Sequence, residues 1–79
     1  MKDDEILARI QAVYDDVMGR TDIILTPETP LVRSNEISSF VLMELIMSIE
    51  EEFNLELTYS TIRSMKTVRG LIKYIKKQV

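Results

Sequence analysis

The sequence predicts an all-α fold: a small bundle of three main helices plus one short helix, with a long loop after the first helix. Apolar residues recur at helical spacing in three stretches, and a loop that contains both prolines of the chain separates the first two. The chain has 79 residues, 46% of them hydrophobic. This size fits a single domain over residues 1–79 and favours compact helices over a large sheet.

The first helix is expected from about Asp4 to Met18. Asp3 or Asp4 is the expected cap, because a short carboxylate accepts the free amide hydrogens of a first turn. Gly19 follows where a left-handed residue ends many helices. The predicted buried stripe, with two supporting side chains, comprises Ile6, Leu7, Ile10, Val13, Tyr14 and Val17.

Residues 20–37 form the long connection, which Pro27 and Pro30 punctuate. Its apolar residues are Ile23, Ile24, Leu25, Leu31 and Val32. A loop so rich in apolar side chains is expected to pack across one end of the bundle. A short strand from Asp22 to Leu25 is an alternative for its first part.

The second helix is expected over about Ser39 to Glu52 and carries apolar residues on two sides. Its core stripe is Leu42, Leu45, Ile46, Ile49 and Phe53. At roughly 100° per residue, a second set lies about 100–160° away from Leu42, namely Phe40, Met43 and Met47, with Glu44 and Glu51 beside it. One interpretation is a helix packed on two sides, which a chain of this length can hardly supply. The favoured interpretation is an exposed docking patch edged by carboxylates.

Two more helices follow the loop at residues 54–57. A short helix is expected near residues 60–64, with Thr58 or Tyr59 at its start. The last helix begins at Thr67, a suitable N-cap residue. Gly70 inside it is explained by close helix packing. The residues that this helix is expected to bury are Val68, Leu71, Ile72, Ile75 and Val79.

Charge is unevenly spread along the chain, whose formal net charge is -3. Residues 1–62 hold all 13 acids and four cations, a net −9, whereas the six cations of residues 63–79 give +6. This asymmetry indicates either solvated helix faces of opposite sign or an acidic surface that steers basic protein partners. The run Glu50, Glu51, Glu52 points in three directions on a helix, which predicts solvation and partner steering rather than a metal site.

Several classes of function are excluded by composition. The chain has no cysteine and no histidine, which excludes disulfides, thiolate zinc sites, a cysteine nucleophile and a serine–histidine–acid triad. The basic segment has only Tyr74 as an interleaved aromatic, which argues against nucleic-acid binding. No apolar run is long enough for a membrane span, and the acidic start does not fit a signal peptide. A cytoplasmic, monomeric binding or carrier module is expected.

The stretch from Ser38 to Leu57 resembles the second helix of acyl carrier proteins. That family carries a D-S-L motif followed by a helix of the form x-x-V-E-L-x-x-x-L-E-E-E-F, and Ser39 falls on its modified serine. The resemblance extends over nearly the whole chain. Thr67-Val68 and Tyr74-Ile75 fit the family's T-V…Y-I signature, and residues 25–31 fit its loop pattern.

The chain diverges from that family at the D-S-L motif. Ser38 stands where the family has aspartate, Phe40 where it has leucine, and Asn35-Glu36 where it has leucine and glycine. A hydroxyl at Ser38 can accept a hydrogen bond from the first amides of the helix, as aspartate would. The divergence suggests a carrier that serves a dedicated biosynthetic pathway.

The resemblance implies an acyl-carrier-like fold and a non-catalytic carrier protein. It implies that a phosphopantetheinyl transferase attaches 4'-phosphopantetheine covalently to Ser39, and that the arm carries acyl groups as thioesters in fatty acid, polyketide or related biosynthesis. The implied partners are acyl-transferring or synthase enzymes with basic docking surfaces. Glu44, Met47 and Glu51 match positions that the family uses in partner contact, and Phe40 and Met43 join them through the stripe.

Two alternatives remain open from the sequence. The chain could carry aminoacyl or peptidyl groups, which sequence separates poorly from acyl groups. It could also be an unmodified helical adaptor with the same fold, an alternative that the missing aspartate motivates.

Overall fold

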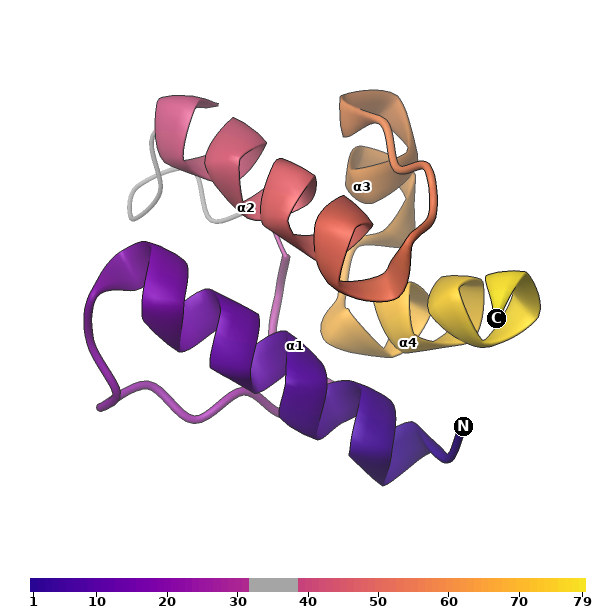
Figure 1. Ribbon diagram of the computed structural model, residues 1–79, viewed down its shortest axis with the longest axis horizontal. Helices are drawn as coiled ribbons and strands as arrows, with labels where there is room; N and C mark the ends of the chain where they lie inside the picture. The colour runs from indigo at the N-terminus through magenta and orange to yellow at the C-terminus, as the bar shows by residue number, and fades with distance from the viewer. Residues whose placement is uncertain (32–38) are drawn as a thin grey trace.

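Four helices make up the fold of the computed structural model, which describes residues 1–31 and 39–79 (Figure 1). They are α1 (Asp3–Met18), α2 (Ser39–Phe53), α3 (Tyr59–Met65) and α4 (Val68–Gln78). α1 and α2 lie side by side, and α4 packs against α1 and α3. Both termini lie on the same side of the molecule (Figure 1). The all-α prediction of three main helices and one short helix is confirmed.

One apolar core joins all four helices. Leu25 adds a side chain from the connection to it. The buried residues are Ile6, Ile10, Leu25, Leu42, Leu45, Ile46, Ile49, Phe53, Leu57, Ile62, Val68, Leu71, Ile72 and Ile75. No polar side chain is buried within the described ranges. Burial of this apolar surface is the main stabilising term for a bundle of this size. The core stripes predicted for α2 and α4 are confirmed, except at Val79, which is 54% exposed at the chain end.

The first helix begins one residue earlier than expected, and neither aspartate caps it. Lys2 is the N-cap residue, and its amide donates to the Glu5 carboxylate at 3.4 Å. Asp3 and Asp4 stand inside the first turn, where negative charge also suits the positive helix end. The other end is as predicted: Gly19 has a φ of 68° and its amide donates to the Asp15 carbonyl at 2.9 Å.

The connection packs against the helices without forming a strand over residues 22–25. The side chain of Gln11 takes the place of a neighbouring strand, because its amide donates to the Ile23 carbonyl at 2.9 Å and accepts from the Leu25 amide at 2.7 Å. Leu25 is buried in the core, as expected of a connection that packs against the bundle, whereas Ile24 is 73% exposed. The prediction for Val32 falls outside the described residues.

The last described residues of the connection bind the turn between α3 and α4. Pro30 and Thr67 form an antiparallel bridge. The Leu31 amide donates to the Lys66 carbonyl at 2.9 Å, and the Val68 amide donates to the Thr29 carbonyl at 2.9 Å. Thr58 caps α3 by accepting from the Thr61 amide, and Thr67 precedes α4 as its N-cap residue. The predicted starts of both helices are therefore confirmed.

Candidate functional site

Ser39 is the first residue of α2, a helix of 15 residues. The amide hydrogens of a first helical turn have no partner within the helix, and the helix dipole makes this end positive. No acidic residue stands in the first turn of α2. A phosphate group joined to the chain here therefore meets a favourable field and no carboxylate from that turn. Ser38, the predicted helix cap, lies outside the described residues.

The second apolar stripe of α2 is exposed. Phe40 is 78% exposed, Met47 62% and Met43 45%, and Glu44 lines one shallow hollow with all three. Glu51 is also exposed, one turn beyond Met47. The prediction that these side chains turn away from the core is confirmed. We call Phe40, Met43, Glu44, Met47 and Glu51 the α2 face.

The solvation predicted for the three consecutive glutamates holds for Glu51 and Glu52, which are exposed, but not for Glu50. Glu50 is half-buried, and its carboxylate accepts from the Leu57 amide at 3.0 Å. Glu52 pairs with Arg9 at 2.7 Å. Two of these acids thus stabilise the loop after α2 and its contact with α1. Only Glu51 among the three points from α2 into solvent without a partner in the described chain.

Arg9 fixes the C-terminal end of α2 against α1. Its Nε donates to the Glu52 carboxylate at 2.7 Å, and a second nitrogen donates to the Glu52 carbonyl at 2.8 Å. The guanidinium also lies over the Phe53 ring, 4.7 Å from its centre. Sequence reasoning missed Arg9, since nothing in periodicity says which acid a surface arginine meets. Sequence reasoning missed Gln11 too. Its position was a usable signal, because Leu7, Gln11 and Tyr14 share one face of the helix and Gln11 places a polar group in that row.

The basic residues of α4 are partly tied to acids elsewhere. Arg69 pairs with Glu28 at 2.5 Å, and Lys76 with Asp3 at 2.8 Å. These hydrogen bonds hold the pKa of Glu28 and of Asp3 below their ordinary values. The basic segment is thus partly neutralised within the fold.

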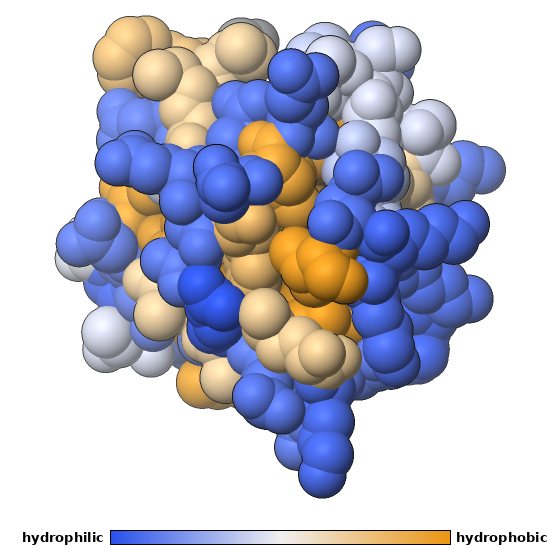
Figure 2. Space-filling view, turned by 45° about the vertical axis from the view of Figure 1, so that its right-hand side comes forward, coloured by the Kyte–Doolittle hydropathy of each residue, from blue (hydrophilic) through white to orange (hydrophobic). Residues whose placement is uncertain are grey.

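Figure 2 shows one face of the molecule on which hydrophilic side chains dominate and a narrow seam of apolar side chains runs between them.

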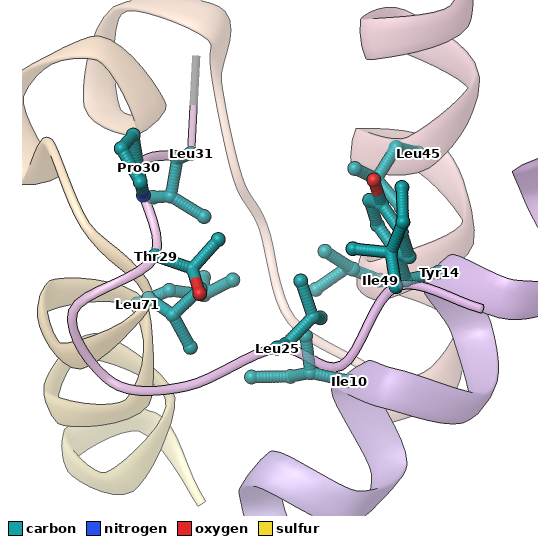
Figure 3. A pocket seen from close by; sticks show the side chains of 11 residues that line it. Ile10, Tyr14, Leu25, Thr29, Pro30, Leu31, Leu45, Ile49 and Leu71 are labelled. Carbon is teal, nitrogen blue, oxygen red and sulfur yellow. The ribbon is translucent and has the colours of Figure 1, made fainter. Parts of the chain in front are cut away.

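A small apolar cavity lies between α1, α2, α4 and the connection (Figure 3). Its volume is about 30 Å³, room for no more than a small group. In Figure 3, Tyr14, Leu45 and Ile49 face Thr29, Leu31 and Leu71 across the gap, with Ile10 and Leu25 at its base. Leu45 is six residues after Ser39, about 9 Å along the helix at 1.5 Å per residue.

No group of three acidic, histidine or cysteine side chains in the described chain is placed to hold a metal ion. No helix within the described ranges is long and apolar enough to cross a membrane. The candidate site consists of the start of α2, the α2 face and the cavity behind the connection.

Comparison with known proteins places this site in context. Residues 8–75 match the family model described as a phosphopantetheine attachment site. A protein named acyl carrier protein from Rubrobacter xylanophilus is 33% identical over 95% of this chain and 93% of its own. Acyl carrier proteins from Thermobifida fusca and Thermosynechococcus vestitus are each 29% identical, over 92% and 100% of this chain and 92% and 98% of their own.

Proposed function

Because the chain belongs to the acyl carrier protein family, whose prosthetic group is 4'-phosphopantetheine, we propose that Ser39 is the attachment residue. On this proposal the chain carries acyl groups as thioesters and presents them to enzymes of fatty acid, polyketide or related biosynthesis. The chain catalyses no step itself. The thiol of the bound arm supplies the thioester chemistry.

The observation that carries the proposal is the place of Ser39 at the first residue of α2, beside an acid-free first turn. In the transfer, the Ser39 oxygen forms a bond to phosphorus of coenzyme A and the pyrophosphate link breaks. Adenosine 3',5'-bisphosphate leaves, and the hydroxyl proton is released. Such a transfer depends on positioning and on charge stabilisation, which a magnesium-dependent transferase supplies. The positive end of α2 favours the phosphodiester that results.

Mass spectrometry tests the attachment directly. The purified chain is incubated with coenzyme A, magnesium and a broad-specificity phosphopantetheinyl transferase. We expect one added phosphopantetheine, which is lost in Ser39→Ala and retained in Ser38→Ala and in the control Ser48→Ala. Addition that survives in Ser39→Ala would show that another residue is modified. No addition with several transferases would favour the unmodified adaptor.

The α2 face is proposed as the docking surface for the transferase and for acyl-handling enzymes. Its apolar side chains are exposed and clustered, which is typical of binding sites. Glu44 and Glu51 add charge that attracts basic surfaces and raises the association rate. Glu50 and Glu52 contribute less to this attraction, because each is already bound within the chain.

Charge reversal on the α2 face tests the docking proposal. Glu44→Lys should slow association with the transferase several-fold and leave thermal stability unchanged, because Glu44 is exposed. Glu56→Lys, an equal charge change at another exposed position, serves as the control. Equal losses in the two variants would indicate a general charge effect and contradict docking at the α2 face.

A further inference from the structure

Among the described residues, Tyr14 is the one polar side chain of the cavity whose hydroxyl has no hydrogen-bond partner. The cavity is lined by 11 residues, of which only Tyr14 and Thr29 carry hydroxyl groups. The Thr29 hydroxyl is already engaged: it accepts from the Thr26 amide at 2.8 Å and lies 3.1 Å from the Thr26 hydroxyl. The Tyr14 hydroxyl has no partner among the described residues. It is also not sealed from water, because no buried side-chain oxygen is left unsatisfied in this part of the chain.

The place of Tyr14 lets it meet a chain that enters the cavity. In Figure 3 its ring stands beside Ile49 and its hydroxyl oxygen lies toward Leu45, on the α2 side of the gap. Tyr14, Ile23, Thr29 and Leu31 are half-buried and Pro30 is exposed, whereas Ile10 and Leu25 behind them are buried. The outer side of the cavity thus includes Tyr14. An entering chain has to widen it there, since about 30 Å³ holds no more than a small group.

We propose that Tyr14 determines specificity for acyl cargo, favouring chains that carry a keto or hydroxyl oxygen over saturated chains. This inference rests on the proposed function as a carrier. A saturated chain that fills the cavity removes water from the Tyr14 hydroxyl and offers no replacement, which is costly for a polar group. An oxygenated chain of the same length accepts a hydrogen bond from that hydroxyl. The rest of the lining is apolar or already bonded and does not distinguish the two.

Matched cargoes test the proposal. The transferase loads the chain from coenzyme A analogues that carry hexanoyl or 3-oxohexanoyl groups through a stable amide, and the Tm of each product is measured. In the native chain the 3-oxohexanoyl form should melt higher by roughly 4 °C, the effect of one net hydrogen bond in a domain of this size. In Tyr14→Phe this difference should disappear, while stabilisation by the hexanoyl group remains.

Tyr74→Phe is the control, because the Tyr74 hydroxyl donates to the Glu56 carbonyl at 2.9 Å and does not line the cavity. It should lower all Tm values alike and preserve the difference. The ring carbon that bears the Tyr14 hydroxyl gives a readout without any variant: its NMR shift should change with 3-oxohexanoyl and much less with hexanoyl. Equal Tm values, or a difference that survives in Tyr14→Phe, would overturn the inference. A chain that accepts no phosphopantetheine would overturn the proposed function and this inference with it, whereas a loaded chain without selectivity would overturn only the latter.

Discussion

One guanidinium, that of Arg9, binds both the side chain and the main chain of Glu52, at 2.7 Å and 2.8 Å. Arg9 belongs to the first turns of α1, and Glu52 to the last turn of α2. Because the guanidinium also covers the Phe53 ring, a single side chain holds the end of α2 in three ways. The planar fork of arginine makes this possible, and a lysine ammonium has no equivalent geometry.

Replacement of Arg9 should therefore be costly even where charge is kept. Arg9→Lys should lower the free energy of unfolding by about 1 kcal/mol, and Arg9→Ala by about 1–2 kcal/mol. The estimate is modest because the ion pair is partly exposed, with 41% and 37% of the two side chains accessible. Urea unfolding measures both. Arg63→Lys, where the arginine lies over Tyr59 at 5.8 Å, is the control and should change stability less. A fully stable Arg9→Lys would show that charge alone matters.

Gln11 should be the side chain on which the first half of the connection depends. Gln11→Met keeps the size but leaves the Ile23 carbonyl and the Leu25 amide without their partner, which should cost about 1–2 kcal/mol. Hydrogen exchange at the Leu25 amide should accelerate more than exchange at other core amides. Gln78→Met, at the exposed end of α4, should have little effect on either measurement. Unchanged protection of Leu25 would mean that the side-chain contact is dispensable.

Gly70 should resist replacement although it stands inside a helix. A Cβ atom at this position would lie 2.7 Å from the Met65 carbonyl oxygen, which is backbone and cannot turn aside. This close approach confirms the packing explanation predicted for Gly70. Gly70→Ala should destabilise the chain by about 1–3 kcal/mol, outweighing the better helix propensity of alanine.

Gly19→Ala gives a useful contrast, since nothing lies within 4 Å of a Cβ there and only the φ of 68° opposes it. Its cost should be about 1 kcal/mol. Thermal unfolding of both variants separates the steric cause from the conformational one. A stabilised Gly70→Ala variant would show that α4 can shift away from Met65.

The ion pair between Asp3 and Lys76 should make the stability of the fold depend on pH, but only in acidic solution. The hydrogen bond from Lys76 lowers the pKa of Asp3 below its ordinary value of 3.8. Since the folded pKa lies below the unfolded one, this contribution to stability is full above pH 3.8 and is lost as pH falls through the folded pKa. NMR titration of the Asp3 carboxyl should show its pKa rising in Lys76→Gln. The pKa of Asp3 should be unchanged in Lys77→Gln. Equal shifts in the two variants would indicate an effect of net charge rather than of the hydrogen bond from Lys76.

Much of this fold follows from the spacing of apolar residues. The stripe of α2 predicts both its buried and its exposed side, because 15 helical residues leave little freedom in where side chains point. The strand alternative for residues 22–25 is wrong for a reason that local sequence does not contain. The backbone partners that a strand would need are supplied by Gln11, a residue more than ten positions away in the chain.

Polar contacts between helices are the part that sequence reasoning did not find. The three glutamates of α2 look equivalent in the sequence, yet Arg9 and the Leu57 amide select two of them. Asp3 and Asp4 likewise suit an N-cap, but α1 begins at Asp3 itself, so both stand inside the helix and Lys2 is the N-cap residue. Such choices depend on where other elements lie, which periodicity does not encode. The role of Ser39 and of the α2 face remains a prediction for the experiments above.

Two sets of hydrogen bonds hold the connection against the helices, and they close loops of very different length. Gln11 meets Ile23 and Leu25 across 12 and 14 positions, whereas Thr29 meets Val68 across the part of the chain that holds both α2 and α3. Loops that are short close at a lower entropic cost and at an earlier stage of folding. We therefore expect the connection to join α1 first and to reach α4 only after α2 and α3 are in place. Residues 29–31 are then the last described part of the connection to join the fold.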